Sequence, residues 1–155
     1  MEIEIRRATP ELAPTLTEVA HLAKRHWRYP ERWIESWREL LTIAPAYIAE
    51  HNVFVAVAGG EIVGFYALTD EGTYWSLDHL WVRPRHIGRG VGRRLFAHAV
   101  ERAHALRPAP LRIESDPHAE RFYLRMGARR IGSVPADMDG VKRVLPHLEL
   151  RVAAE

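Results

Sequence analysis

The sequence predicts a mixed α/β fold of the α+β type, with about seven strands in a mainly antiparallel sheet and four helices. Three observations lead to this fold class. The turn signals Gly59-Gly60 and Asp70-Glu71-Gly72 join three β-prone runs into an antiparallel meander. A long helical stripe then separates the third of these strands from the next one, so that these two strands should be parallel. Finally, 155 residues without a repeat or a linker suit one domain, 1–155, with a real core.

The spacing of apolar residues, prolines and glycines places the individual elements. Before the meander we expect a strand at 2–7, a helix from an N-cap at Thr9 and Pro10 to about His26, a second helix from Pro30 to Leu41, and a helical turn at 45–50. From the meander onward we expect strands at 53–58, 61–69 and 73–83, a helix at 88–106, a strand at 111–114, a helix capped by Asp116-Pro117 and ended by Gly127, and strands at 129–134 and 147–152. A polar loop, 135–146, joins the last two strands.

Three alternate glycines, Gly88, Gly90 and Gly92, lead into the helix at 88–106. A glycine turn at a helix N-terminus presents backbone N–H donors and the positive end of the helix dipole, which suits phosphate groups. The loop is not a P-loop, because no Gly-Lys-Ser/Thr follows. It is not a dinucleotide fingerprint either, because Arg93 stands where the third glycine would be.

Composition narrows the classes of function. The net charge is only +2, but arginines concentrate between Arg83 and Arg94, which favours a compact anionic ligand over a nucleic-acid track. No cysteine is present, which excludes disulfides and a thiol nucleophile, and the histidines form no compact metal-ligand motif, so no metal is expected. No apolar run approaches 18 residues and the start lacks the core of a signal peptide, so we expect a cytoplasmic protein.

Large aromatic side chains gather between the two N-terminal helices, at Trp27, Tyr29, Trp33 and Trp37. Rings at helical spacing pack a core in most proteins. Apolar walls also line substrate pockets, and both interpretations stay open. If these rings line a substrate pocket, Trp27, Tyr29 and Trp33 bind the substrate.

The order of these elements resembles the GCN5-related N-acetyltransferase (GNAT) superfamily over almost the whole chain. The glycine loop Ile87-Gly88-Arg89-Gly90-Val91-Gly92 matches the family's Arg/Gln-x-x-Gly-x-Gly/Ala motif, and IESDPHAERFYLRMGA (113–128) matches its strand and Phe-Tyr-bearing helix. Two departures stand out. Ile87 replaces the usual Arg or Gln, which leaves only the backbone donors at that position. Asp116 replaces an Asn that relatives often carry, which puts a negative charge near the cofactor.

The resemblance implies that acetyl-CoA binds where the parallel strands 73–83 and 111–115 separate at a β-bulge of the first. The pyrophosphate would lie on the backbone amides of the glycine loop, and the pantetheine would pair with the strand at 80–82. The side chains of Arg89, Arg93 and Arg94 would reach the phosphates. The cofactor-binding residues implied are Leu80, Trp81, Val82, Ile87, Gly88, Arg89, Gly90, Val91, Gly92, Arg93, Asp116 and Phe122.

The chemistry implied is direct attack of a neutral amine on the thioester through a tetrahedral intermediate, whose oxyanion meets the Val82 N–H. Tyr123 stands where the family has its proton donor, although a buried tyrosine can also be merely structural. The base is Asp78, His79 or a water relay, because relatives often carry Glu or His here. A polar strand residue can equally be just solvated.

A non-catalytic acyl-CoA-binding or sensor module of the same fold is the rival interpretation, and Ile87 and Asp116 are its only support. The acceptor is expected to be a primary amine of a small molecule or a peptide. We expect residues 26–37 and the loop 135–146 to shape the pocket that binds it. Dimers are frequent in similar proteins, so the oligomeric state stays open between a monomer and a homodimer. Neither nucleic acid nor membrane is an expected partner.

Overall fold

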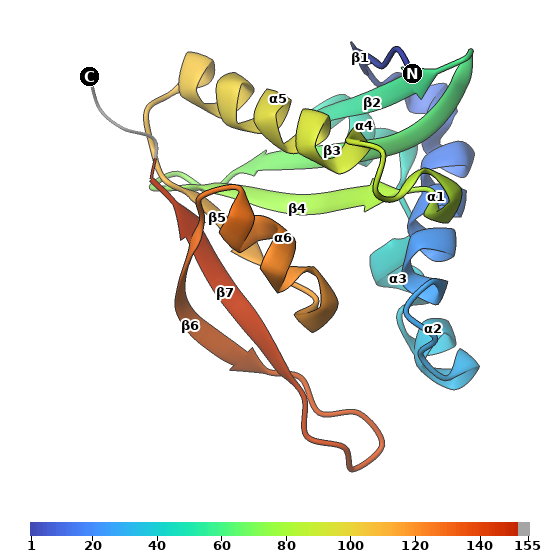
Figure 1. Ribbon diagram of the computed structural model, residues 1–155, viewed down its shortest axis with the longest axis vertical. Coiled ribbons are helices and arrows are strands. Elements are labelled where there is room, and N and C mark those ends of the chain that lie inside the picture. Colours follow the sequence, from blue (N-terminus) through green and yellow to red (C-terminus); the bar gives the residue numbers. More distant parts are fainter. Residues whose placement is uncertain (152–155) are drawn as a thin grey trace. The chain divides into compact units, whose positions relative to one another are not determined.

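Seven strands are hydrogen-bonded in the order β1-β2-β3-β4-β5-β7-β6 in the computed structural model, which describes residues 1–151 (Figure 1). The strands are β1 (Glu4–Arg7), β2 (Asn52–Ala58), β3 (Glu61–Asp70), β4 (Trp75–Val82), β5 (Leu111–Glu114), β6 (Arg129–Pro135) and β7 (Val144–Leu150). The helices are α1 (Ala13–Arg25), α2 (Glu31–Ser36), α3 (Arg38–Leu41), α4 (Pro45–Glu50), α5 (Val91–Leu106) and α6 (Glu120–Arg125), with 3₁₀ turns η1 (Pro10–Leu12), η2 (Pro84–His86) and η3 (Pro117–Ala119).

The predicted fold class is confirmed. The strand pairs β1–β2, β2–β3, β5–β7 and β6–β7 are antiparallel, and β4–β5 is parallel, as the crossover through α5 requires. The parallel register covers the first two residues of each strand, Trp75 with Leu111 and Ser76 with Arg112. The β-bulge expected in β4 stays a prediction.

The chain forms two compact units. The first comprises Met1–Leu68 and His79–Ala99, and the second comprises Thr69–Asp78 and the described part of Val100–Glu155. β4 therefore contributes its start to the second unit and its end to the first.

In the first unit, successive side chains of β2 and β3 point to opposite faces of the sheet, and both faces are apolar. On one face Val53, Val55, Phe65 and Ala67 pack with an apolar cluster from the N-terminal segments, whose buried members include Leu16, Val19, Ala20, Leu41, Ile43 and Ile48. The stripe of α1 thus provides one layer of the core. On the opposite face lies α5, and Tyr66 of β3 meets His98 of α5 with 2.8 Å between the hydroxyl and Nδ1.

The second unit is built around β5, β7 and β6. Leu111 and Leu148 are fully buried in it. Glu149 of β7 is also buried, and it accepts hydrogen bonds from Arg112 at 3.2 Å and from Arg151 at 3.1 Å. Burial alone would raise the pKa of Glu149, but the two guanidinium donors outweigh it and leave that pKa below the ordinary value of 4.5.

The N-terminal helices differ in detail from the prediction. Thr9 precedes η1, and its side chain makes no capping hydrogen bond to that turn. The regular helix α1 starts only at Ala13, because Pro14 lacks an N–H and fits only the first turn of a helix. The helix expected from Pro30 to Leu41 is divided at Trp37, whose backbone leaves the helical region at ψ 6°.

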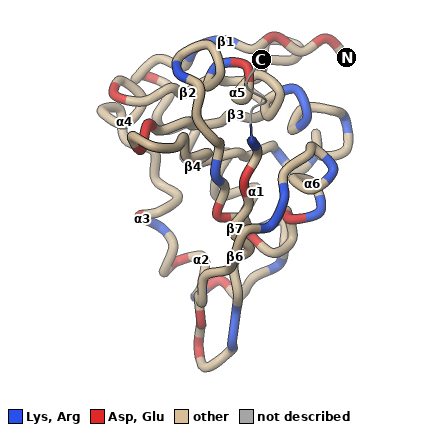
Figure 2. The backbone as a smooth tube through the Cα atoms, turned by 90° about the vertical axis from the view of Figure 1, so that its left-hand side faces the viewer, with Lys and Arg blue, Asp and Glu red and all other residues tan. Residues whose placement is uncertain are grey.

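The two C-terminal strands, β6 and β7, extend further than predicted at the ends that face their connecting loop. They run to Pro135 and from Val144, so the connecting loop is 136–143 rather than 135–146. Asp139 and Gly140 both have positive φ, 50° and 76°, which is the backbone that matches a tight hairpin to the twist of its strands. Figure 2 shows acidic residues on one arm of this tip and basic residues on the other. The predicted strand end at Val152 lies outside the described residues.

Candidate active site

The glycine loop lies between the 3₁₀ turn η2, which was not predicted, and α5, which begins at Val91 rather than at the expected position 88. Gly88 and Gly90 have φ of 81° and 86°, a left-handed conformation that other residues rarely adopt. A Cβ built on either glycine would meet nothing within 4 Å, so the space beside the backbone is open. Both residues are exposed, whereas Val91 is buried and anchors the start of the 16-residue helix α5. The loop therefore offers backbone N–H groups and a helix N-terminus to an anion, which is the fit that a pyrophosphate needs.

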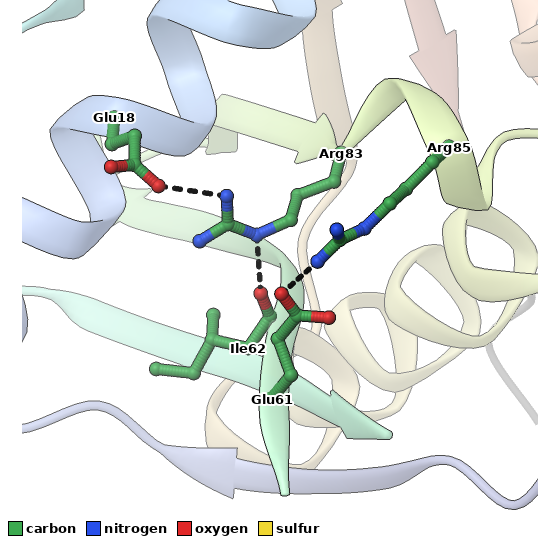
Figure 3. A network of polar contacts seen from close by, with 5 residues as sticks. All are labelled: Glu18, Glu61, Ile62, Arg83 and Arg85. Carbon is green, nitrogen blue, oxygen red and sulfur yellow. Dashed lines mark hydrogen bonds and ion pairs between the residues drawn. The ribbon is translucent and has the colours of Figure 1, made fainter. Parts of the chain in front are cut away.

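Arg83 fixes the entry to this loop (Figure 3). Its backbone N–H donates to the Val63 carbonyl at 2.8 Å, its Nε to the Ile62 carbonyl at 2.7 Å, and its Nη1 to the Glu18 carboxylate at 2.8 Å. Only 13% of the Arg83 side chain is exposed. Arg83 therefore ties the end of β4 to β3 and α1. The sequence showed it only as one arginine of a basic run, because the bonds that it makes join positions far apart in the chain.

The other arginines of this run have different surroundings. Arg89 and Arg93 are exposed beside the loop. Arg94 donates instead to the carbonyl of Ile3 at 3.0 Å, so its guanidinium serves the N-terminal segment. Arg85 pairs with Glu61, and the side chain of Arg85 is exposed whereas Glu61 is half-buried.

His86 is another feature that sequence reasoning missed. Its Nδ1 is buried without a hydrogen-bond partner within residues 1–151. Burial, and then the charges of Arg85, Arg89 and Arg83, lower the pKa of His86. Its imidazole is therefore neutral at physiological pH, and the positive charge beside the loop comes from arginine.

The burial of the β4 side chains changes at Asp78. Trp75 and Leu77 are buried, Asp78 is exposed, and His79 to Val82 are all half-buried. Asp78 and His79 thus differ in their surroundings, as expected for neighbours on a strand. His79 lies in an aromatic environment made by Tyr47 and Phe65, with ring centroids 5.8 Å and 6.0 Å away. The indole Nε1 of Trp81 donates to Nδ1 of His79 at 2.9 Å.

The predicted residues Asp116, Phe122 and Tyr123 all belong to the second unit. The Asp116 carboxylate caps η3, as predicted, by accepting from the His118 N–H at 2.9 Å, and the same oxygen lies 2.9 Å from His118 Nδ1. Tyr123 is 6% exposed and packs edge to face against Phe122. Burial, with a further contribution from the Asp116 carboxylate, raises the pKa of Tyr123 well above its ordinary value of 10.0.

The aromatic residues of the N-terminal segment form a cluster in the first unit. Tyr29 stacks on Trp33 at 5.8 Å and meets Trp37 edge to face at 5.1 Å. The Lys24 ammonium lies 4.3 Å from the Trp37 ring centroid and 5.0 Å from that of Tyr29. Trp27 packs against the neighbouring His26 ring. The structure thus joins two of the predicted substrate residues, Tyr29 and Trp33, in one cluster.

Within residues 1–151, the structure lacks two kinds of feature. No group of three or more His, Asp or Glu side chains in this range is arranged to hold a metal ion. No helix in the same range combines the length and the apolar character needed to cross a membrane.

Comparison with known proteins gives a family match. The family model described as an acetyltransferase (GNAT) domain matches residues 25–146. A GCN5-related N-acetyltransferase from Rhodopseudomonas palustris has a TM-score of 0.80 at 19% identity, over 98% of this chain and 97% of its own. The PaiA N-acetyltransferase from Thermoplasma acidophilum, solved with coenzyme A, has a TM-score of 0.76 at 23% identity, over 98% and 100%.

A third solved structure, yncA from Salmonella typhimurium with its cofactor acetyl-CoA, has a TM-score of 0.73 at 20% identity, over 100% of this chain and 96% of its own. At these identities the likeness to solved structures concerns the fold alone. The search of curated proteins found no significant match.

Proposed function

Because the chain belongs to the GCN5-related N-acetyltransferase superfamily, we propose that it transfers the acetyl group of acetyl-CoA to a primary amine of a small molecule or peptide. The observation that carries this proposal is the glycine loop. Gly88 and Gly90 hold a left-handed backbone beside open space, directly before the N-terminus of α5. That combination suits a pyrophosphate bound by backbone amides.

The residues that would hold the cofactor form groups, each of which binds a different part of acetyl-CoA. The amides from Ile87 to Gly92 hold the pyrophosphate, with Arg89 and Arg93 exposed to add positive charge. The backbone of Leu80, Trp81 and Val82 pairs with the amide groups of the pantetheine, as an added strand does. Asp116 and Phe122 complete the set that we assign to the cofactor. When bound, acetyl-CoA supplies an acyl group activated as a thioester.

In the proposed reaction, Asp78, or a water that it orients, removes the proton from the attacking amine. The Val82 N–H stabilises the negative charge that develops on the carbonyl oxygen. Tyr123 assists departure of the thiolate. The raised pKa of Tyr123 makes it a poor proton donor to a thiolate, because a free thiol has a pKa of about 8.5. We therefore assign Tyr123 the role of a hydrogen-bond donor that keeps its proton.

The aromatic cluster, in which Trp33 is buried and Tyr29 half-buried, supports our choice of acceptor class. We propose that Trp27, Tyr29 and Trp33 wall the acceptor site, which suits an amine with an apolar or aromatic part. The hairpin tip, 136–143, is the second segment that we assign to acceptor recognition.

A thiol-release assay tests the proposal. The full chain is mixed with acetyl-CoA and a panel of aromatic and aliphatic amines and amino-terminal peptides, and free coenzyme A thiol is measured. Release that depends on one class of amine supports the enzyme. Calorimetric binding of acetyl-CoA without release for any amine would favour a sensor module instead. If acetyl-CoA does not bind, both functions are excluded.

A further inference from the structure

The hydrogen bond between Trp81 and His79 decides what His79 is able to do in the reaction. An indole nitrogen carries a hydrogen and has no lone pair to accept with, so Trp81 Nε1 is the donor in the 2.9 Å contact. The Nδ1 atom of His79 must then be the acceptor. An imidazole that accepts at Nδ1 carries its hydrogen at Nε2.

We infer that Trp81 holds His79 in the neutral Nε2–H form, and that His79 serves the reaction as a hydrogen-bond donor rather than as the general base. The basic lone pair of a neutral imidazole is its unprotonated nitrogen. In His79 that lone pair is taken up by the Trp81 indole. Protonating it would replace an N–H···N hydrogen bond by two N–H groups facing each other. The Nε2 atom already carries a hydrogen and has no lone pair to receive the proton of an attacking amine.

Two aromatic rings hold the His79 ring in its orientation. Tyr47 meets His79 nearly edge to face, with an interplanar angle of 85°, and Phe65 lies against it at 34°. Tyr47 comes from α4 and Phe65 from β3, so separate elements hold the ring in place. Trp81 is the positioning residue, because it is two places along the same strand and its indole reaches back to His79.

The inference rests on the proposed function only where it concerns the reaction, since the protonation state can be measured without acetyl-CoA. The full chain, labelled with ¹⁵N-histidine, is examined by NMR at pH 7, and the His79 signals are assigned by their loss in His79→Gln. We expect an unprotonated Nδ1 and a protonated Nε2 in the wild type. In Trp81→Phe we expect the Nδ1 resonance to move, because this nitrogen loses its N–H donor. A protonated Nδ1 in the wild type, or an unchanged Nδ1 resonance in Trp81→Phe, would overturn the inference.

Turnover gives the second measurement. Glutamine at position 79 keeps an N–H donor near the place of Nε2, whereas leucine keeps neither a donor nor a base. We expect His79→Leu to lower kcat by about 10-fold or more relative to His79→Gln, because one well-placed donor contributes on that scale or above. Equal losses in both variants would contradict the donor role. If no amine is acetylated at all, the enzyme proposal fails while the NMR result still decides the tautomer.

Discussion

Gly64 lies directly against the backbone of Trp81. A Cβ placed on Gly64 would be 2.7 Å from the Trp81 carbonyl oxygen, a separation at which one of the two must move. It would also be 3.1 Å from Leu95 and 3.2 Å from Val91 of α5. The close approach of two strands and the helix thus depends on a residue without a side chain. Trp81 is central to the stretch that we assign to the pantetheine, so this packing sets the position of that backbone.

Gly64→Ala is expected to lower both stability and acetyl-CoA affinity. Overpacking at a site bounded by backbone costs about 1 to 3 kcal/mol. Because the displaced atom belongs to the Trp81 peptide, we also expect acetyl-CoA binding to weaken by about 10-fold. Chemical denaturation and calorimetry measure the two effects. Gly132→Ala is the matched control, since nothing lies within 4 Å of a Cβ at that position of β6. Equal stability of the two variants would show that Gly64 tolerates a side chain.

Arg83 and Arg85 offer a second matched pair, because they are two residues apart and both bond to other parts of the first unit. Arg83→Met removes hydrogen bonds to the Ile62 carbonyl and to Glu18 from a largely buried guanidinium. We expect a loss of about 1.5 to 3 kcal/mol in the free energy of unfolding. Arg85→Met removes only an exposed ion pair and should cost about 0.5 kcal/mol or less. Urea denaturation of both variants checks this order, and a larger loss for Arg85→Met would reverse it.

Much of this fold could be predicted because the turn residues and the spacing of apolar residues indicate the same elements that form the core. Glycine turns and alternating apolar residues placed the meander, and the crossover through α5 made β4 and β5 parallel. Helix ends were less certain: Pro14 moves the start of α1, and nothing local in the sequence marks the break at Trp37. Asp139-Gly140 did carry a turn signal that would have shortened the predicted loop.

The candidate site was predicted unevenly for a similar reason. The glycine loop is local, and its left-handed backbone could be anticipated from Gly88 and Gly90 alone. The hydrogen bonds of Arg83 and Arg94 join residues that are far apart in sequence, so no spacing rule identifies them. The contact between Trp81 and His79 spans only two positions, but two-residue spacing on a strand shows a shared face and not a hydrogen bond.

Glu149 gives a prediction on acid stability. Its pKa is lower in the folded protein than the ordinary 4.5, so its contribution is fully present above about pH 4.5 and is lost as the pH falls through the folded value. Glu149→Gln should therefore be less stable than the wild type at pH 7 by about 1 to 3 kcal/mol. The difference should shrink below pH 4. Thermal unfolding from pH 3 to 7 measures it, and a difference that is constant with pH would contradict the assignment.

Tyr123 gives a prediction at the other end of the pH scale. Its pKa is higher in the folded protein than the ordinary 10.0, so its contribution is present below pH 10 and falls as the pH rises above that value. The stability of the wild type should therefore decline more steeply above pH 10 than that of Tyr123→Phe. Denaturation between pH 8 and 11 compares the two. Parallel curves would mean that the Tyr123 hydroxyl is not shifted by burial.

The same variant tests the role of Tyr123 in turnover. We expect Tyr123→Phe to lower kcat by about 10²-fold and to leave acetyl-CoA affinity nearly intact. Since the hydroxyl keeps its proton, the wild-type rate should not fall between pH 8 and 10 through ionisation of Tyr123. An unchanged kcat in Tyr123→Phe would remove this residue from the mechanism.

The backbone cradle for acetyl-CoA is tested most directly by calorimetric titration of acetyl-CoA into the wild type, Gly90→Val and Ile87→Ala. Gly60→Val is the control for backbone strain, because Gly60 also has a positive φ, 77°, but lies in the β2–β3 turn. We expect the wild type, Ile87→Ala and Gly60→Val to bind acetyl-CoA with similar affinity, and Gly90→Val to lose at least about 10-fold, since its side chain strains the loop and enters the space beside it. Equal losses in Gly90→Val and Ile87→Ala, or no binding by the wild type, would contradict a cradle built from the loop's amides.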